Sequence, residues 1–300
     1  MTTSLLDDLR DAGFRGEIQS EAKLGPMTTW RIGGPAELLA APIDAEDLVR
    51  AVRWANALGV PWRVLGNGSN VLVADAGVRG LVLRIRKSLD AVEIAGSTIV
   101  VGAGASFPSL ANTAAQRGLA GIEFGAGIPG SVGGAIVMNG GWHEFEIGNV
   151  VSRVAYLEAD GTAVDYDHDA CGFGYRTSVF RGRSGIVLTA ELALTPDDPA
   201  AVKERLSRFA ESRKANQPTE LPSCGSVFLK PEGDFAGRLI EAAGLKGRRI
   251  GGIQVSEKHA NFFVNVGGGT AKDALALVEL VEREVAEKLG VKLTREFEVW

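Results

Sequence analysis

Cysteine is scarce in this sequence, and its scarcity excludes a class of fold. Only Cys171 and Cys224 occur among 300 residues, and no C-x-x-C pair is present. Two cysteines cannot build the disulfide framework of a small secreted domain, and no cluster of His, Cys and carboxylate residues has metal-ligand spacing. We therefore expect a cytoplasmic protein with free thiols and no bound metal.

Long apolar runs and an excess of positive charge are also absent. No run approaches the roughly 18 apolar residues that span a bilayer. The acidic start, MTTSLLDDLRDAGF, lacks the basic and apolar regions of a secretory signal. Because 37 acidic residues outnumber 32 basic ones, the formal net charge is −5. We therefore expect neither membrane insertion nor a nucleic-acid partner.

Hydrophobic periodicity predicts a mixture of helices and strands, which indicates an α+β fold. The most strongly marked helix has Thr270 as its N-cap, Asp273 at the capping-box position and Gly290 after its end. The pair Asp160-Gly161, between two strand-like runs, predicts a hairpin. The predicted helices cover 44–59, 106–118, 196–218, 235–243 and 271–289. The predicted strands cover 62–66, 70–75, 80–85, 97–104, 185–195, 226–230, 252–256, 261–266 and 291–300.

Glycine is abundant, with 39 residues, and two glycine-rich segments are candidates for binding an anion. GAGIPG (125–130) matches the dinucleotide fingerprint G-x-G-x-x-G, but a poor strand precedes it, and Gly133 and Gly134 argue against a firm helix after it. The second segment, LGNGSNVLVAD (65–75), lies between two strand-like pieces. Either segment alone could be a plain turn. Both together, without a Walker lysine, favour a long diphosphate-containing cofactor over ATP.

Six motifs in a fixed order resemble the UDP-N-acetylenolpyruvoylglucosamine reductase (MurB) family, flavoenzymes of peptidoglycan synthesis. The resemblance covers nearly the whole chain. The motifs are TTWRIGGPA (28–36), VLGNGSNVLVADAGVRGLVL (64–83), GIEFGAGIPGSVGGAIVMNGG (121–141), GYRTSVF (174–180), PSCGSVFLKP (222–231) and KHANFFVNVGGGTAKD (258–273).

The resemblance implies a domain organisation and a reaction. It implies an FAD-binding domain of the vanillyl-alcohol-oxidase (PCMH) type over residues 1–195, in lobes of about 1–85 and 86–195. A smaller substrate-binding domain covers 196–300. The reaction is the NADPH-dependent reduction of UDP-N-acetylglucosamine enolpyruvate to UDP-N-acetylmuramate, with FAD bound non-covalently. The chain is similar to the shorter class, which lacks an extra tyrosine loop, and is expected to be a monomer.

The chemistry of this reaction defines what the site must supply. Hydride transfer to the terminal alkene carbon moves charge toward the substrate carboxylate, so the enolate-like species needs a cation or strong donors. The adjacent carbon then needs a proton from a positioned acid. By resemblance, Arg176 is the catalytic arginine, whose planar fork suits a carboxylate. Ser226 matches the proton donor, and Glu296 matches the third catalytic position.

Without the resemblance, each of these residues has an ordinary structural reading. Arg176 reads as a surface arginine, Ser226 as a turn hydroxyl, and His143 and His168 as surface residues. Cys224 has no evident base beside it, so we interpret it as a packed residue rather than a nucleophile.

The remaining site residues also come from the resemblance. Lys230 replaces an asparagine that commonly touches substrate, and a cation there could meet the UDP diphosphate. The predicted substrate contacts are Tyr175, Lys230, His259 and Asn261. The predicted FAD contacts are Gly66, Asn67, Gly68, Ser69, Asn70, Gly127, Ile128, Pro129, Gly130, Gly133, Gly134 and Asn139.

Two alternative functions stay open at the level of sequence. A flavin-dependent oxidase of a small hydroxy compound would share the glycine-rich segments, and it would turn over with dissolved oxygen. A non-catalytic nucleotide-sugar-binding module would remain colourless after FAD is added.

Glu296 is expected to act as a hydrogen-bond donor, because a carboxyl group beside the substrate carboxylate has a raised pKa. Glu296→Gln keeps a donor at this position and should retain most activity, whereas Glu296→Ala should lose it. Steady-state turnover of the two variants tests the role. An equally deep loss in both variants would contradict it.

Overall fold

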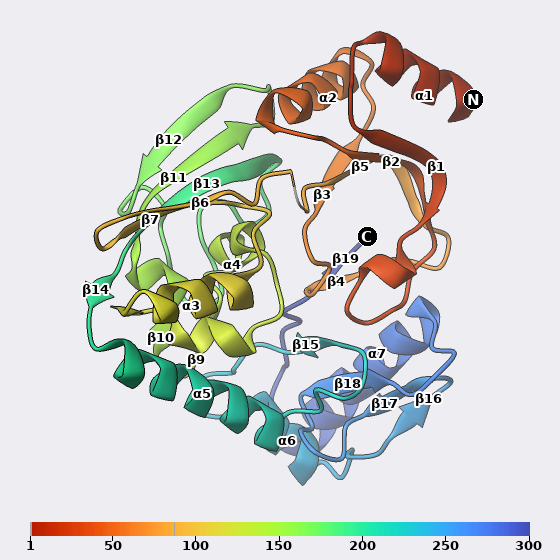
Figure 1. Ribbon diagram of the computed structural model, residues 1–300. Coiled ribbons are helices and arrows are strands. Elements are labelled where there is room, and N and C mark those ends of the chain that lie inside the picture. Colours follow the sequence, from red (N-terminus) through yellow and green to blue (C-terminus); the bar gives the residue numbers. More distant parts are fainter. Residues whose placement is uncertain (1, 87) are drawn as a thin grey trace. The chain divides into compact units, whose positions relative to one another are not determined.

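The computed structural model describes residues 2–86 and 88–300, which form two compact units (Figure 1). Unit 1 comprises residues 1–21, 37–67 and 79–212, and unit 2 comprises residues 22–36, 68–78 and 213–300. Each unit is therefore assembled from three separate segments of the chain. The functional division into residues 1–195 and 196–300 stays a prediction.

The first sheet of unit 1 comes from the N-terminal part of the chain. Its strand order is β1 (Glu17–Lys23), β2 (Pro35–Ala41), β5 (Val78–Arg84) and β3 (Trp62–Leu65), with β3 parallel to β5. Helix α1 spans Thr2–Asp11 and helix α2 spans Ala45–Ala57. The Asp44 side chain caps α2 by accepting from Asp47 N, which confirms the predicted start of this helix.

The second sheet of unit 1 is entirely antiparallel. Its strand order is β12 (Ala163–Asp167), β11 (Val151–Glu158), β13 (Gly185–Ala193), β7 (Thr98–Gly102) and β6 (Val92–Ala95). Strands β11 and β12 flank Asp160-Gly161, so the predicted hairpin is confirmed. Antiparallel pairing of sequence neighbours is typical of the α+β class that the sequence indicates.

Two helices of unit 1 stand beside this sheet. The predicted helix over 106–118 is α3 (Phe107–Gln116), and the short helix α4 (Val132–Val137) packs on β13 and β7 (Figure 1). Gly133 and Gly134, which in the sequence argue against a firm helix, lie within α4, a helix of 6 residues. A Cβ on Gly133 would lie 2.8 Å from Ala103 Cβ, so the glycine lets the helix approach the sheet closely.

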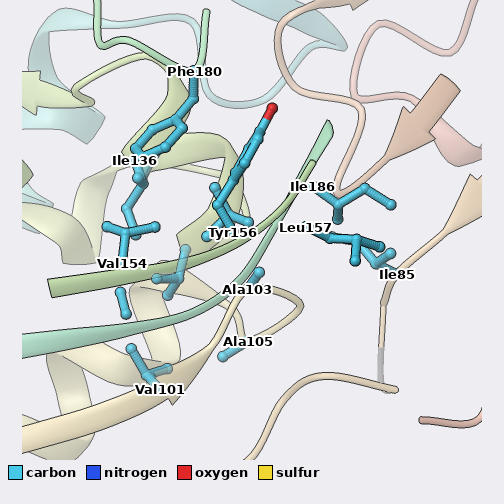
Figure 2. Close-up of a cluster of buried hydrophobic side chains, with 14 of the residues drawn as sticks. Ile85, Val101, Ala103, Ala105, Ile136, Val154, Tyr156, Leu157, Phe180 and Ile186 are labelled. Atoms are coloured by element: carbon cyan, nitrogen blue, oxygen red, sulfur yellow. The ribbon is translucent and has the colours of Figure 1, made fainter. Parts of the chain in front are cut away.

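The core of unit 1 lies between the second sheet and these helices. Figure 2 shows Val154 and Tyr156 from the sheet beside Ile136 from α4 and beside Phe180. Each of these side chains is 2% exposed or less. Full burial of one such apolar side chain stabilises a fold by about 1.5–3 kcal/mol.

Unit 2 contains an antiparallel sheet with two helices. Its strand order is β15 (Ser223–Ser226), β18 (Phe262–Asn265), β17 (Ile253–Val255) and β16 (Arg249–Ile250). Helices α6 (Ala236–Ala242) and α7 (Ala271–Leu289) confirm the predicted helices over 235–243 and 271–289. A separate parallel pair joins β4 (Val71–Leu72) to β19 (Glu298–Val299).

Three strand predictions in unit 2 were wrong in their bounds. The strand expected over 70–75 is reduced to Val71–Leu72. The strand expected at 226–230 lies instead at Ser223–Ser226. Just beyond it, both backbone groups of Phe228 bond to the Asn261 side chain rather than to a strand. The strand expected over 291–300 is reduced to β19, preceded by an isolated bridge between Phe228 and Arg295. Alternating polarity thus marked an extended segment rather than a continuous strand.

The remaining elements are short, apart from one long helix. Helix α5 (Pro199–Asn216) begins three residues later than the prediction. No helix of the described residues is long and apolar enough to cross a membrane. The short 3-10 helices are η1 (Gly25–Met27), η2 (Glu123–Gly127) and η3 (Ile147–Asn149). The short strands form two pairs, β8 (Leu119–Ala120) with β14 (Thr195–Pro196) and β9 (Gly141–Trp142) with β10 (Phe145–Glu146).

The capping box of α7 should contribute measurably to stability. Thr270 Oγ1 accepts from Asp273 N at 3.0 Å, and Asp273 Oδ2 accepts from Thr270 N at 3.1 Å. Thr270→Ala should lower the free energy of unfolding by about 1 kcal/mol, measured by urea denaturation. Thr270→Ser retains the cap and should be nearly neutral. Equal losses in the two variants would show that the cap is not the cause.

Candidate active site

The loop between β3 and β4 presents backbone N–H groups that the protein leaves unused. Asn67, Gly68, Ser69 and Asn70 donate no backbone hydrogen bond to any described residue, although Gly68 O accepts from Thr29 N at 3.0 Å. Gly68 is buried and the other three are half-buried. Because buried N–H groups require an acceptor, the loop suits an anion such as a phosphate.

The second glycine-rich segment is more fully engaged with the protein. The backbone N–H groups of Ile128, Gly133 and Gly134 all donate to protein oxygens, at 3.0, 2.9 and 3.3 Å. Pro129 has no N–H to offer. The N–H of Gly130 is buried and has no acceptor in the described part of the chain. This segment therefore offers an anion fewer donors than the loop at 67–70.

Tyr175 and Arg176 form the tip of a tight turn in unit 1. Gly174 and Thr177 exchange backbone hydrogen bonds of 3.0 and 3.1 Å across it. Arg176 has a φ of +52°, which is uncommon for a residue other than glycine. Its Nη2 donates to Gly141 O at 2.8 Å, and its guanidinium lies 5.4 Å from the centre of the Tyr175 ring. The turn presents an arginine fork beside a half-exposed aromatic side chain.

Asn139 lies at the end of α4, where its side chain is enclosed by the protein. The residue is 2% exposed and has a φ of +44°. Its Nδ2 donates to Glu146 Oε2 at 2.8 Å and to Gly174 O at 2.9 Å, and its Oδ1 accepts from Gly148 N at 2.9 Å. The side chain is thus engaged within unit 1, and its assignment as an FAD contact stays a prediction.

Ser226 ends β15 in unit 2, directly after a bulge. The ladder pairs Ser223 with Val264 and Ser226 with Phe262, and its register shifts between these pairs. Gly225 has a φ of +83°, while a Cβ there would meet nothing within 4 Å. The backbone angle, rather than lack of space, therefore requires glycine before Ser226.

Glu296 lies on a segment of unit 2 that runs beside the residues following β15. Its N–H donates to Val227 O at 2.9 Å, and its carbonyl accepts from Asn70 Nδ2 at 3.3 Å. The neighbouring Arg295 makes two hydrogen bonds of 2.7 Å to the Glu282 carboxylate of α7. Such a bidentate pair fixes the segment against the helix.

Cys224 has the environment of a packed residue rather than a nucleophile. It is 3% exposed. Burial raises the pKa of its thiol, and the nearby Glu296 carboxylate raises that pKa further. Burial also raises the pKa of the Cys171 thiol, to about 11. Both thiols are therefore uncharged at neutral pH, whereas a nucleophilic cysteine must be a thiolate.

Asn261 holds the segment that follows Ser226. Its Oδ1 accepts from Phe228 N at 3.0 Å, and its Nδ2 donates to Phe228 O at 2.8 Å. The residue is 7% exposed. One amide thus replaces a pair of ladder bonds just where β15 ends.

The other two predicted substrate contacts differ in environment. Lys230 is exposed, and its Nζ lies 4.6 Å from the centre of the exposed Phe235 ring. His259 is half-buried, and burial lowers the pKa of its ring. Its Nδ1 accepts from Asn261 N at 3.2 Å, so the imidazole is a neutral structural acceptor in this position.

Arg213 is a candidate that sequence reasoning missed. The side chain of this half-buried arginine of α5 makes no hydrogen bond or ion pair within the described part of the chain, and burial lowers its pKa to about 10. A buried cation without a partner suits an anionic ligand. Charged residues are frequent throughout α5, so no sequence signal distinguishes Arg213. Among the described residues, no group of three or more His, Cys, Asp and Glu could hold a metal ion.

Comparison with known proteins decides the family. The model of the "UDP-N-acetylenolpyruvoylglucosamine reductase, C-terminal domain" matches residues 217–300, and that of the "FAD binding domain" matches residues 36–167. The UDP-N-acetylenolpyruvoylglucosamine reductase of Rubrobacter xylanophilus is 50% identical over 273 residues, 91% of each chain. That of Moorella thermoacetica is 44% identical over 298 residues, 99% of this chain and 98% of the relative.

The chain belongs to the UDP-N-acetylenolpyruvoylglucosamine reductase family.

Comparison with solved structures confirms that the chain has the fold of this reductase family. The MurB structure from Thermus caldophilus has a TM-score of 0.82 and 39% identity, and the match covers 95% of this chain and 99% of that one. Berberine bridge enzyme from Eschscholzia californica shares only the fold. Its TM-score is 0.50 and its identity 17%, and the match covers 65% of this chain and 44% of that one. The predicted α+β fold, with an FAD-binding domain of this type and a C-terminal domain, is confirmed.

The residues of the reductase fit its FAD cofactor. The unused N–H groups of the loop at 67–70 are suited to a diphosphate. Gly68 is required there, because a Cβ would lie 2.7 Å from Met27 O. A Cβ on Gly66 would lie 2.5 Å from Ser131 Oγ. The glycines thus allow this loop to lie close against neighbouring protein atoms.

Cys224→Ala should retain activity within about twofold, because a buried neutral thiol supplies neither a nucleophile nor an acid. Turnover of the purified variant measures this. In the native protein both cysteines should resist a thiol reagent at pH 8 and react only after unfolding. A loss of turnover as large as that of Ser226→Ala would refute the packing role.

Proposed function

We propose that Arg176, Ser226 and Glu296 carry out the reaction of this family, the reduction of UDP-N-acetylglucosamine enolpyruvate to UDP-N-acetylmuramate in peptidoglycan synthesis. NADPH is the reductant. Bound FAD supplies the hydride that reaches C3 of the enolpyruvyl group. The observation that carries the proposal is the Arg176 turn, which holds a permanently charged fork in one backbone conformation.

Each catalytic residue has a distinct task. The Arg176 guanidinium pairs with the substrate carboxylate and stabilises the negative charge that develops there. Ser226 donates a proton to C2, and the bulge at Gly225 sets the backbone direction from which its hydroxyl is presented. Glu296, in its protonated form, donates a hydrogen bond to the same carboxylate.

The ligand contacts divide by chemistry. The N–H groups of the loop at 67–70 bind the diphosphate of FAD. Gly130 remains a predicted FAD contact. Lys230 and Arg213 provide positive charge for the diphosphate of UDP, because phosphate groups pair well with both cations. Tyr175 offers an exposed ring beside Arg176. The other predicted contacts of FAD and substrate keep their assignments from the resemblance.

Family membership favours this reductase over the oxidase and over the non-catalytic module. We further propose that the enzyme works as a monomer in the cytoplasm, where NADPH is available, without membrane insertion. Its net charge of −5 is in keeping with a small-molecule substrate rather than nucleic acid.

An anaerobic experiment tests the function and the roles separately. NADPH should bleach the flavin absorbance, and UDP-N-acetylglucosamine enolpyruvate should restore it. Ser226→Ala and Arg176→Lys should leave the bleaching rate unchanged and slow the return of absorbance by about 100-fold or more, because each removes an interaction that forms in the transition state. Return of absorbance only with oxygen would favour the oxidase. Unchanged rates in the variants would refute the assigned roles.

A further inference from the structure

The amide of Asn139 connects two parts of unit 1 that are both in contact with Arg176. One part is the turn at 174–177, whose backbone Asn139 Nδ2 reaches at Gly174 O, 2.9 Å away. The other is the segment around β9 and β10, which Asn139 reaches at Glu146 Oε2 and at Gly148 N, 2.8 and 2.9 Å away. Every polar group of this side chain therefore has a partner.

The same segment receives the Arg176 guanidinium. Arg176 Nη2 donates to Gly141 O at 2.8 Å, and Nη1 lies 3.5 Å from the carbonyl oxygen of Asn139 itself. Gly141 pairs with Glu146 in the β9–β10 hairpin, which the Asn139 side chain holds. Asn139 thus fixes both the turn that carries the guanidinium and the carbonyl groups that accept from it.

Burial makes this arrangement rigid and specific. Asn139 is 2% exposed, so loss of its amide would leave the buried N–H of Gly148 without a partner. It would also remove one of the two hydrogen bonds that Gly174 O accepts, the other being from Thr177 N. Its φ of +44° lies in the left-handed region, which asparagine adopts more readily than most residues. Arg176 also has a left-handed backbone, at φ +52°, so its turn depends on neighbouring contacts to hold that conformation.

We propose that Asn139 is a positioning residue for Arg176, acting through the turn at 174–177 and the β9–β10 hairpin rather than through contact with FAD. The inference rests on the proposed function, in that Arg176 must first be the group that stabilises the substrate carboxylate. Misplacement of such a group by about 1 Å can slow a reaction by about 100-fold. Substitution of Asn139 should therefore slow the reduction of substrate, which uses Arg176. It should not affect the reduction of the flavin by NADPH, which does not use Arg176.

Asn139→Gly is the sharpest variant, because glycine keeps the left-handed backbone and removes only the amide. We expect the substrate-dependent return of flavin absorbance to slow by about 10- to 100-fold. The rate of bleaching by NADPH and the spectrum of bound flavin should stay unchanged. Glu21→Gly is a matched control, since Glu21 is exposed and has a φ of +51° in the same unit, and it should behave like the parent enzyme.

A double variant separates positioning from a general structural effect. In Arg176→Lys the guanidinium fork is already lost, so adding Asn139→Gly should slow the return of absorbance by much less than it does alone. Multiplication of the two single effects would overturn the proposal. A changed flavin spectrum or weaker flavin retention in Asn139→Gly would also overturn it, because Asn139 would then be a cofactor contact.

The outcomes also distinguish this inference from the proposed function. If Arg176→Lys is slow and Asn139→Gly is normal, the inference fails and the role of Arg176 stands. If Arg176→Lys is normal, the proposed function fails first. If Asn139→Gly does not fold, two variants of Glu146 replace it in the test. Glu146→Gln keeps an acceptor for Asn139 and should show the parent rates. Glu146→Leu should slow only the substrate-dependent return of flavin absorbance. Equal rates in these two variants would overturn the inference.

Discussion

Buried asparagine amides hold the segments that carry the candidate catalytic groups. Asn139 bonds to Gly174 O near Arg176, and Asn261 bonds to both backbone groups of Phe228 just after Ser226. In each unit the chain leaves regular secondary structure at this point, and its backbone groups lose their ladder partners. A buried amide can replace them because it offers donors and an acceptor on one short side chain. The rigidity of these irregular segments depends on that replacement.

Unusual backbone angles occur at the same places. Gly225 and Arg176 both lie in the left-handed region, one in a bulge and one at the tip of a turn. Glycine adopts this region without strain, but an arginine there costs about 1–2 kcal/mol. The contacts around the Arg176 turn offset that cost. The conformation is favourable only as part of the folded unit, which is why an isolated GYRTSVF peptide would not be expected to show it.

Local sequence signals were sufficient where a residue acts on its immediate neighbours. The capping box of α7 and the Asp160-Gly161 hairpin were predicted correctly, because both depend on residues within a few positions of each other. Local signals were insufficient for the short helix α4, where Gly133 allows close packing on Ala103, about 30 residues earlier in the chain. They were insufficient again at β15, beyond which both backbone groups of Phe228 bond to the Asn261 side chain. Long-range packing outweighed local propensity in both places.

The sequence by itself determined the family, since its six ordered motifs name the residue types that the reaction requires. It also indicated that Cys224 is a packed residue, and burial of the thiol in the structure agrees with this. Only the tertiary structure decided what these polar residues touch. Asn139 and Asn261 read as ligand contacts in sequence, yet both amides are buried and bonded to backbone. Arg213 was one charge among many in α5 until burial left it without a partner. Burial and hydrogen-bond partners depend on which distant segments meet, and residue spacing along one chain does not contain that information.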